Sequence, residues 1–220
     1  TTVEGSTATL NAGRHLTNVA VDAATTADLI AAIDVSGSSV TAGGNVVITA
    51  TAGTIQGTTG LGGGTMDLTA GKEIDGSDFT AAGDIEITAT DLAASSFISE
   101  GGNITVHPLS NIIDTTIWAK NGSVIFLGGG VGDEIDGATI SSGGSLTVIA
   151  NWIVGSNLIA ENGLLDVTAN TIDGSVLLSK QGSIDLDVAI ALNATNLAAR
   201  DNIDADGNPV ALTSTITDSS

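Results

Sequence analysis

Oxygen-bearing side chains alternate in one short stretch near the end of the chain, at Asp204, Asp206 and Asn208, around a glycine. Carboxylate and amide oxygens at alternate positions of a glycine-containing turn are typical of calcium-binding loops. A complete loop would continue with further ligands and an acidic residue near its twelfth position, whereas residues 209–211 are PVA. We interpret the stretch as a turn in an inserted corner, with a calcium site as the alternative. No other cofactor is indicated.

Carboxylates of neighbouring repeats form the second candidate site. Asp67, Asp84 and Glu86 are expected to point outward close to one another, and paired carboxylates can transfer protons or hold a cation. No basic or aromatic residue is expected beside them, so a solvated acidic surface is the preferred interpretation. His15 and His107 lie about five repeats apart and cannot share a site, and the chain has no cysteine. We therefore expect no enzyme, and keep a carbohydrate-active enzyme as a minor alternative.

Two tryptophans are candidates for ligand binding. Trp118 and Trp152 adjoin Ile117 and Ile153, which are expected to point inward, so strand alternation turns both indole rings outward. An exposed tryptophan is a common platform for a sugar or a neighbouring protein. The alternative is that neighbouring turns partly cover the rings.

Short repeated strands must position all these residues. Apolar residues stand two, four and six positions after a mark that recurs at intervals of 19 to 22 residues, and this period of two indicates half-buried β-strands. The ten marks are Ser6, Thr25, Gly44, Gly64, Gly83, Gly102, Gly122, Gly144, Gly163 and Gly182. No polar residue interrupts the three columns, so the repeat extends over nearly the whole chain.

Each repeat contains two further apolar pulses. The second ladder is Ile55, Ile74, Leu92, Ile112 or Ile113, Ile135, Ile153, Ile172 and Leu192. The third ladder is Val40, Phe79, Phe97, Ile117, Ile140, Leu158, Leu177 and Leu197. Three strands per repeat predict an all-β fold, a right-handed parallel β-helix of about ten triangular coils of 19–22 residues.

The β-helix is expected to be a single domain over residues 1–220, with regular coils at about 6–201. An irregular last partial coil and tail would occupy residues 202–220. A left-handed β-helix would need strict six-residue sides, which the drifting period lacks. A leucine-rich repeat is the closer alternative, but the leucine expected three residues before the strand is missing, and the other half of the repeat has no helical spacing.

Charge and composition exclude several classes of partner. There are 25 acidic residues against five basic ones, for a net charge of −20, which would repel nucleic-acid phosphates. No run of about 18 apolar residues exists, so no membrane insertion is expected. Residues 1–4 lack the features of a signal peptide, so we expect a mature chain or an internal piece of a longer one. The composition is typical of secreted prokaryotic surface proteins.

Residues 158–169, LIAENGLLDVTA, resemble the filamentous haemagglutinin-type repeats of large bacterial exoproteins, as do residues 117–124, IWAKNGSV. The resemblance covers roughly residues 44–202 and implies a right-handed β-helical shaft of an adhesin at the cell surface. It assigns no functional residue. We therefore expect a non-enzymatic extracellular structural or adhesive protein that binds a host-cell or neighbouring-cell glycan or protein. The alternative is a subunit that associates end to end into an extracellular filament or sheath.

Overall fold

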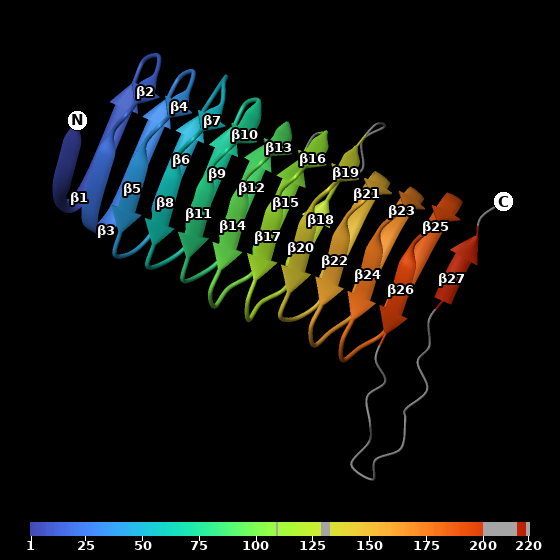
Figure 1. The fold of residues 1–220 in the computed structure, drawn as a ribbon. Helices are drawn as coiled ribbons and strands as arrows, with labels where there is room; N and C mark the ends of the chain where they lie inside the picture. Colours follow the sequence, from blue (N-terminus) through green and yellow to red (C-terminus); the bar gives the residue numbers. More distant parts are fainter. Residues whose placement is uncertain (109, 129–132, 200–214, 219–220) are drawn as a thin grey trace, which may run out of the picture.

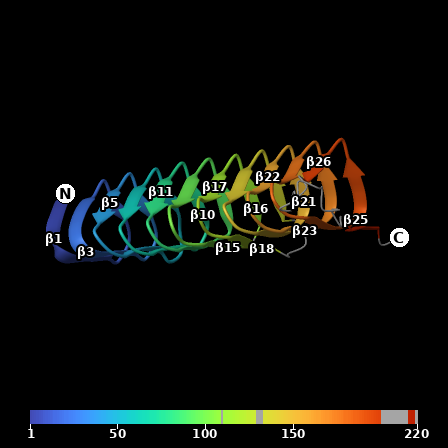
Figure 2. The same cartoon turned by 90° about the horizontal axis from the view of Figure 1, so that it is seen from below.

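The chain forms a solenoid of parallel strands. The computed structural model describes residues 1–108, 110–128, 133–199 and 215–218, and within them there are 27 strands and no helix. Every strand pairing among the described residues is parallel, and each strand pairs with strands one coil away (Figure 1). The predicted β-helix of about ten coils is therefore confirmed. In Figure 1 the strands on the near side run downward while the chain advances from left to right, which is the right-handed sense; Figure 2 shows the same strands along its upper edge.

Each coil contributes a strand to three faces, which we call faces A, B and C. Face A contains β1 (Thr2–Ala12), β3 (Ala20–Ala31), β6 (Val46–Ala50), β9 (Met66–Ala70), β12 (Ile85–Ala89), β15 (Ile104–Pro108), β18 (Val124–Leu127), β21 (Leu146–Val154), β23 (Leu165–Asp173), β25 (Ile184–Asn193) and β27 (Thr215–Asp218). Face B contains β2 (Leu16–Thr17), β4 (Val35–Ser36), β7 (Ile55–Gln56), β10 (Glu73–Asp75), β13 (Asp91–Ala93), β16 (Asn111–Ile113) and β19 (Glu134–Asp136). Face C contains β5 (Ser39–Ala42), β8 (Thr59–Gly62), β11 (Asp78–Ala81), β14 (Ser96–Ser99), β17 (Thr116–Ala119), β20 (Thr139–Ser142), β22 (Asn157–Ala160), β24 (Val176–Ser179) and β26 (Asn196–Ala199).

Five strands turn a corner and serve two faces. The first halves of β1 and β3 pair along face C, and the second halves of β21, β23 and β25 pair along face B. The last described strand, β27, pairs with β25 on face A, with Ile216 opposite Leu186.

The core lies between the three faces and is built from the predicted columns. In the first column Ile85, Ile104 and Val124 are in register on successive coils, and all three are buried. The second ladder uses Ile112, because Ile113 points outward and is 41% exposed. Burying each such side chain stabilises the fold by about 1.5–3 kcal/mol.

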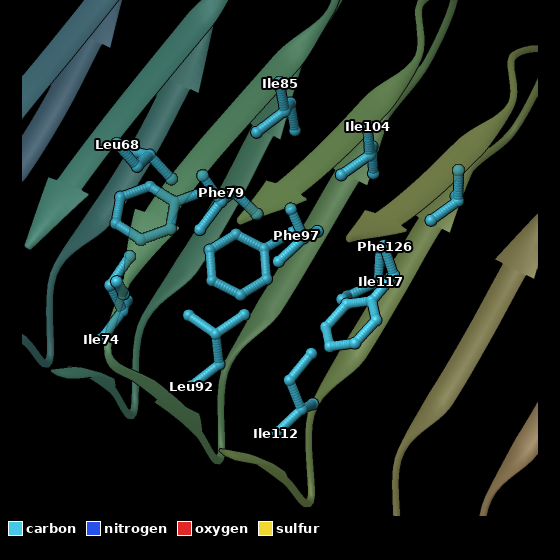
Figure 3. Packing of buried hydrophobic residues seen from close by; sticks show 14 of the residues in the cluster. Leu68, Ile74, Phe79, Ile85, Leu92, Phe97, Ile104, Ile112, Ile117 and Phe126 are labelled. Carbon is cyan, nitrogen blue, oxygen red and sulfur yellow. The ribbon is translucent and has the colours of Figure 1, made fainter. Parts of the chain in front are cut away.

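Phenylalanines are the largest side chains in this core. Phe79 and Phe97 occupy consecutive rungs of the third ladder, and their rings stack with centroids 5.7 Å apart (Figure 3). On the preceding coil the same rung is Gly60, where a β-carbon would lie 2.6 Å from the Phe79 ring. The third ladder predicted from sequence skips this coil because the Phe79 ring occupies the space that a side chain at Gly60 would need.

A left-handed residue ends the face B strand of every regular coil. These residues have φ between 43° and 62° and are Asn18, Gly37, Gly57, Gly76, Ala94, Asp114, Gly137, Gly155, Gly174 and Ala194. Glycine tolerates this conformation because it has no β-carbon. The repeated turn directs the chain from face B into face C at the same place in each coil.

A buried hydroxyl follows most of these turns. The series is Ser38, Thr58, Ser77, Ser95, Thr115, Ser156, Ser175 and the half-buried Thr195, and Val19 and Ala138 stand in place of a hydroxyl residue after the other two turns. The Ser77 hydroxyl donates to the Asp75 carbonyl (3.0 Å) and accepts from the Thr58 amide of the preceding coil (3.1 Å). The backbone carbonyl of Ser77 accepts from the Ser96 amide of the following coil and is not available to Thr58. The Ser77 hydroxyl is therefore the acceptor for the Thr58 amide. We call this series the hydroxyl ladder.

Candidate interaction surfaces

The middle outward position of face C forms an exposed, largely apolar row along the rod. Its members, in register on successive coils, are Leu61, Thr80, Ile98, Trp118, Ser141, Ile159, Leu178 and Ala198. We call this row the face C stripe. Leu61 is 52% exposed and Trp118 40% exposed, whereas most of the other members are half-buried by their neighbours.

Trp118 lies near the centre of the stripe. Its neighbours along the ladder are Ile98 on one side and Ser141 on the other. The Lys120 ammonium lies 4.9 Å from the indole centroid and 2.5 Å from a Glu100 carboxylate oxygen. A cation over an indole at an exposed site contributes about 0.5–1 kcal/mol. The ammonium therefore favours this orientation of the indole, which remains open to solvent on its outer side.

A second ion pair lies at the same position of the coil, directly after the face C strands β22 and β24. The Lys180 ammonium lies 2.6 Å from a Glu161 carboxylate oxygen. From β14 to β26 the strands of face C contain no charged residue, and the two carboxylates that follow them are each paired with a lysine. This part of face C is electrically balanced, although the whole chain carries a net charge of −20.

Trp152 lies on a different surface. It is on face B, between Glu134 and Thr171 along the ladder, and is 42% exposed. Both tryptophans point outward as predicted, but they lie two coils apart on different faces. The structure therefore does not bring them into one site, and binding by either remains a prediction.

The outward acids of face A form close pairs. Asp67 and Glu86 are in register on adjacent coils, and partial burial, followed by the Glu86 charge, raises the pKa of Asp67. Asp84 instead accepts a hydrogen bond from the backbone amide of Asn103 (2.6 Å) and so stabilises the corner that precedes the face A strands. The imidazole Nε2 of His107 lies 3.8 Å from a Glu86 oxygen, a basic partner that the sequence did not predict.

The same arrangement recurs near the other end of face A. Asp166 and Asp185 are in register on adjacent coils. Partial burial, followed by the charge of Asp185, raises the pKa of Asp166. These pairs are sites of like-charge repulsion between coils.

No group of three or more histidine, cysteine or acidic side chains arranged to hold a metal ion occurs among the described residues. The predicted calcium ligands Asp204, Asp206 and Asn208 lie outside the described residues. Nor does the described part of the chain hold a helix long and apolar enough to cross a membrane.

The comparisons with known proteins are negative: no protein-family model, curated protein or solved structure matches the chain. A function can therefore be inferred only from the geometry of the rod and the chemistry of its faces.

Sequence reasoning missed the face C stripe as a surface. Its members are 18 to 23 residues apart, so they come together only when the coils are in register. A usable signal exists, because several third strands contain two consecutive apolar residues, as in Phe97-Ile98, Ile117-Trp118 and Leu177-Leu178. The first residue of each pair is buried and the second is the outward one.

Proposed function

We propose that this chain is a non-enzymatic structural and adhesive rod that acts outside the cell. The observation that carries the proposal is the stacking itself: on face A each strand from β1 to β25 pairs with the next, and the inward columns are filled by apolar side chains. With coils about 4.8 Å apart, ten coils make a rod of roughly 50 Å. Such a rod holds whatever its faces carry at a fixed distance and orientation.

The chemistry of the outward faces supports a binding role. Trp118 and Trp152 are two of the eight exposed large hydrophobic side chains in the described chain, and each has a polar neighbour that could orient a sugar hydroxyl. Aromatic rings with polar neighbours suit the apolar face and the hydroxyl edge of a sugar. The partner we propose is a glycan or protein of a host or neighbouring cell. The acidic surface disfavours nucleic acid.

Binding to glycan arrays and to intact cells tests the adhesive role. Trp118→Ala and Trp152→Ala are assayed separately because they lie on different faces, and Leu127→Ala on face A is the control at a similarly exposed apolar position. We expect one tryptophan variant to lose most of the binding and the control to retain it. Binding that survives both tryptophan variants removes these residues from the proposal, and a lack of binding to any cell surface contradicts the adhesive role.

A second candidate function is assembly end to end into a filament or sheath. Coils stack through parallel strand pairs such as β1 with β3, and a strand of another copy can extend such a stack through the same backbone hydrogen bonds. Electron microscopy of the purified protein separates the two functions. Fibres of constant width favour the filament, and short separate rods favour the adhesive shaft.

A further inference from the structure

We propose that face C is a homotypic interface, through which two copies of this chain pack side by side. The inference concerns β8 to β26 and the face C stripe. It goes beyond the rod function proposed above and bears on one part of it, because a lateral partner covers Trp118 and leaves Trp152 open to a ligand.

Electrostatics selects this face. Two copies that each carry a charge of −20 repel one another, and the acid pairs of face A concentrate that repulsion. From β14 to β26 the charges of face C are the Glu100–Lys120 and Glu161–Lys180 pairs, which cancel within each copy. An acidic rod can therefore approach a second acidic rod along β14 to β26 without placing unpaired carboxylates against each other, and Asp78 of β11 is the one charged residue in the remaining two strands of the interface.

The stripe has the chemistry of an interface core. Leu61, Ile98, Trp118, Ile159 and Leu178 place apolar surface outward along one line, and the ion pairs lie on the row beside it. Aromatic residues are enriched in interface centres, and charged residues in the rim. Eight strands of about four residues span a flat area of about 500 Å² per copy, and about 1,000 Å² in total is the lower end for a specific, reversible pair.

The distribution of the stripe favours an antiparallel pair. Ser141 is small and lies midway, with Ile98 and Trp118 on one side and Ile159 and Leu178 on the other. A two-fold axis near Ser141 brings Trp118 against Ile159 of the second copy, and the pair closes without further growth. Trp118 is then covered, whereas Trp152 on face B stays at the surface.

Sedimentation at increasing protein and salt concentrations tests the pairing. We expect a reversible dimer that strengthens with salt, because salt screens the repulsion between the acidic copies. The double variant Ile98→Asp with Leu178→Asp should weaken dimerisation more than about tenfold, because it places like charges at the contact. Leu127→Asp is the matched control on face A and should leave the dimer intact; circular dichroism checks that each variant keeps its strands.

A second measurement keeps the native stripe almost unchanged. The chain has no cysteine, so Ser141→Cys introduces a single thiol at the predicted two-fold axis, and Thr147→Cys introduces one on face A. A short bis-maleimide should cross-link the first variant into dimers and leave the second monomeric. A protein that stays monomeric at high concentration and salt, or a dimer that Leu127→Asp disrupts and the face C variant does not, overturns the proposal. Equal cross-linking of the two thiols also overturns it.

Discussion

Replacing Ser77 by alanine tests whether the hydroxyl ladder holds the coils together. Ser77 is fully buried, and its hydroxyl accepts the hydrogen bond of the Thr58 amide in the preceding coil. Ser77→Ala keeps the backbone and most of the side-chain volume but removes this acceptor. The Thr58 amide is then left buried without a partner.

The expected cost follows from which groups lose their partners. The Asp75 carbonyl, which the hydroxyl also contacts, still accepts from the Gly57 amide at 2.9 Å and stays satisfied. The loss is therefore concentrated on one buried amide, for which the penalty is about 1–3 kcal/mol. Thr59→Ala is the control, because it removes an exposed hydroxyl one residue away from Thr58.

The opposite change is available in the same chain. Ala138 occupies the position of a hydroxyl residue and offers no acceptor to the Thr115 amide of the preceding coil, while its own amide donates to Ser156 (3.1 Å). Ala138→Ser supplies the missing acceptor and should raise the free energy of unfolding by about 0.5–1.5 kcal/mol. The two substitutions therefore test one mechanism with opposite signs.

Urea denaturation and amide hydrogen exchange measure both effects. The urea midpoint should fall for Ser77→Ala and rise for Ala138→Ser at unchanged m value. Exchange at the Thr58 amide should accelerate about 5- to 150-fold in Ser77→Ala, which corresponds to the same 1–3 kcal/mol if opening is local. The reasoning is refuted if Ser77→Ala costs no more than Thr59→Ala and Thr58 exchange does not change.

Two further predictions concern charge and close packing. Asp67→Asn should raise the melting temperature at neutral pH: the raised pKa of Asp67 means that the folded state binds its proton more tightly than the unfolded state, so the ionised carboxylate beside Glu86 lowers stability. The gain over wild type should shrink as the pH falls below the folded-state pKa of Asp67 and vanish below its ordinary, unfolded-state pKa, and a gain that persists in stronger acid contradicts the assignment. Gly122→Ala should cost about 1–3 kcal/mol in urea denaturation, because its β-carbon would lie 2.0 Å from the Gly102 carbonyl oxygen. Gly13→Ala, with nothing within 4 Å of the new β-carbon, is the matched control, and equal losses in the two variants would show that the close approach is not the cause.

The stacking could be predicted from sequence because its signal is local. Each face A strand up to β25 has apolar residues at every second position, most of them separated by polar ones, and this spacing recurs at a nearly constant interval. Register follows from the same pattern, since a slip of one residue would turn an entire strand inside out. Ile112 and Ile113 show the limit of this reasoning, because adjacent isoleucines do not reveal which one points inward.

Other features depend on contacts between coils and were harder to predict. The left-handed turns at Asn18, Ala94 and Asp114 carry no glycine signal, although glycine occupies the same turn in most coils. The hydroxyl ladder does leave a trace, since a serine follows the glycine at Ser77 and Ser175. Its role becomes visible only when the acceptor of each turn amide is traced to the next coil.

The candidate surfaces were predicted in part. Strand alternation correctly placed Trp118 and Trp152 on the outside, but the pattern within one strand cannot show whether two outward residues share a face. Nor could it show that His107 lies beside Glu86, because the two residues are on adjacent coils and offset by two positions along the strands. A binding site on a solenoid depends on which outward residues of different coils lie side by side. That placement depends on the number of residues in each coil and its turns.

The direction of the backbone hydrogen bonds also determines how the rod responds to force. The strands cross the rod axis, so the bonds that join coil to coil, such as those between β21 and β23, lie along it. Tension along the axis therefore pulls these bonds apart one coil at a time instead of shearing a whole sheet at once. A coil of 19 residues, the spacing from Leu146 to Leu165, is about 4.8 Å thick when stacked and about 65 Å long when extended. A tethered rod would thus lengthen in nearly equal steps as its end coils peel away, and shorten again as they restack on the coils that remain.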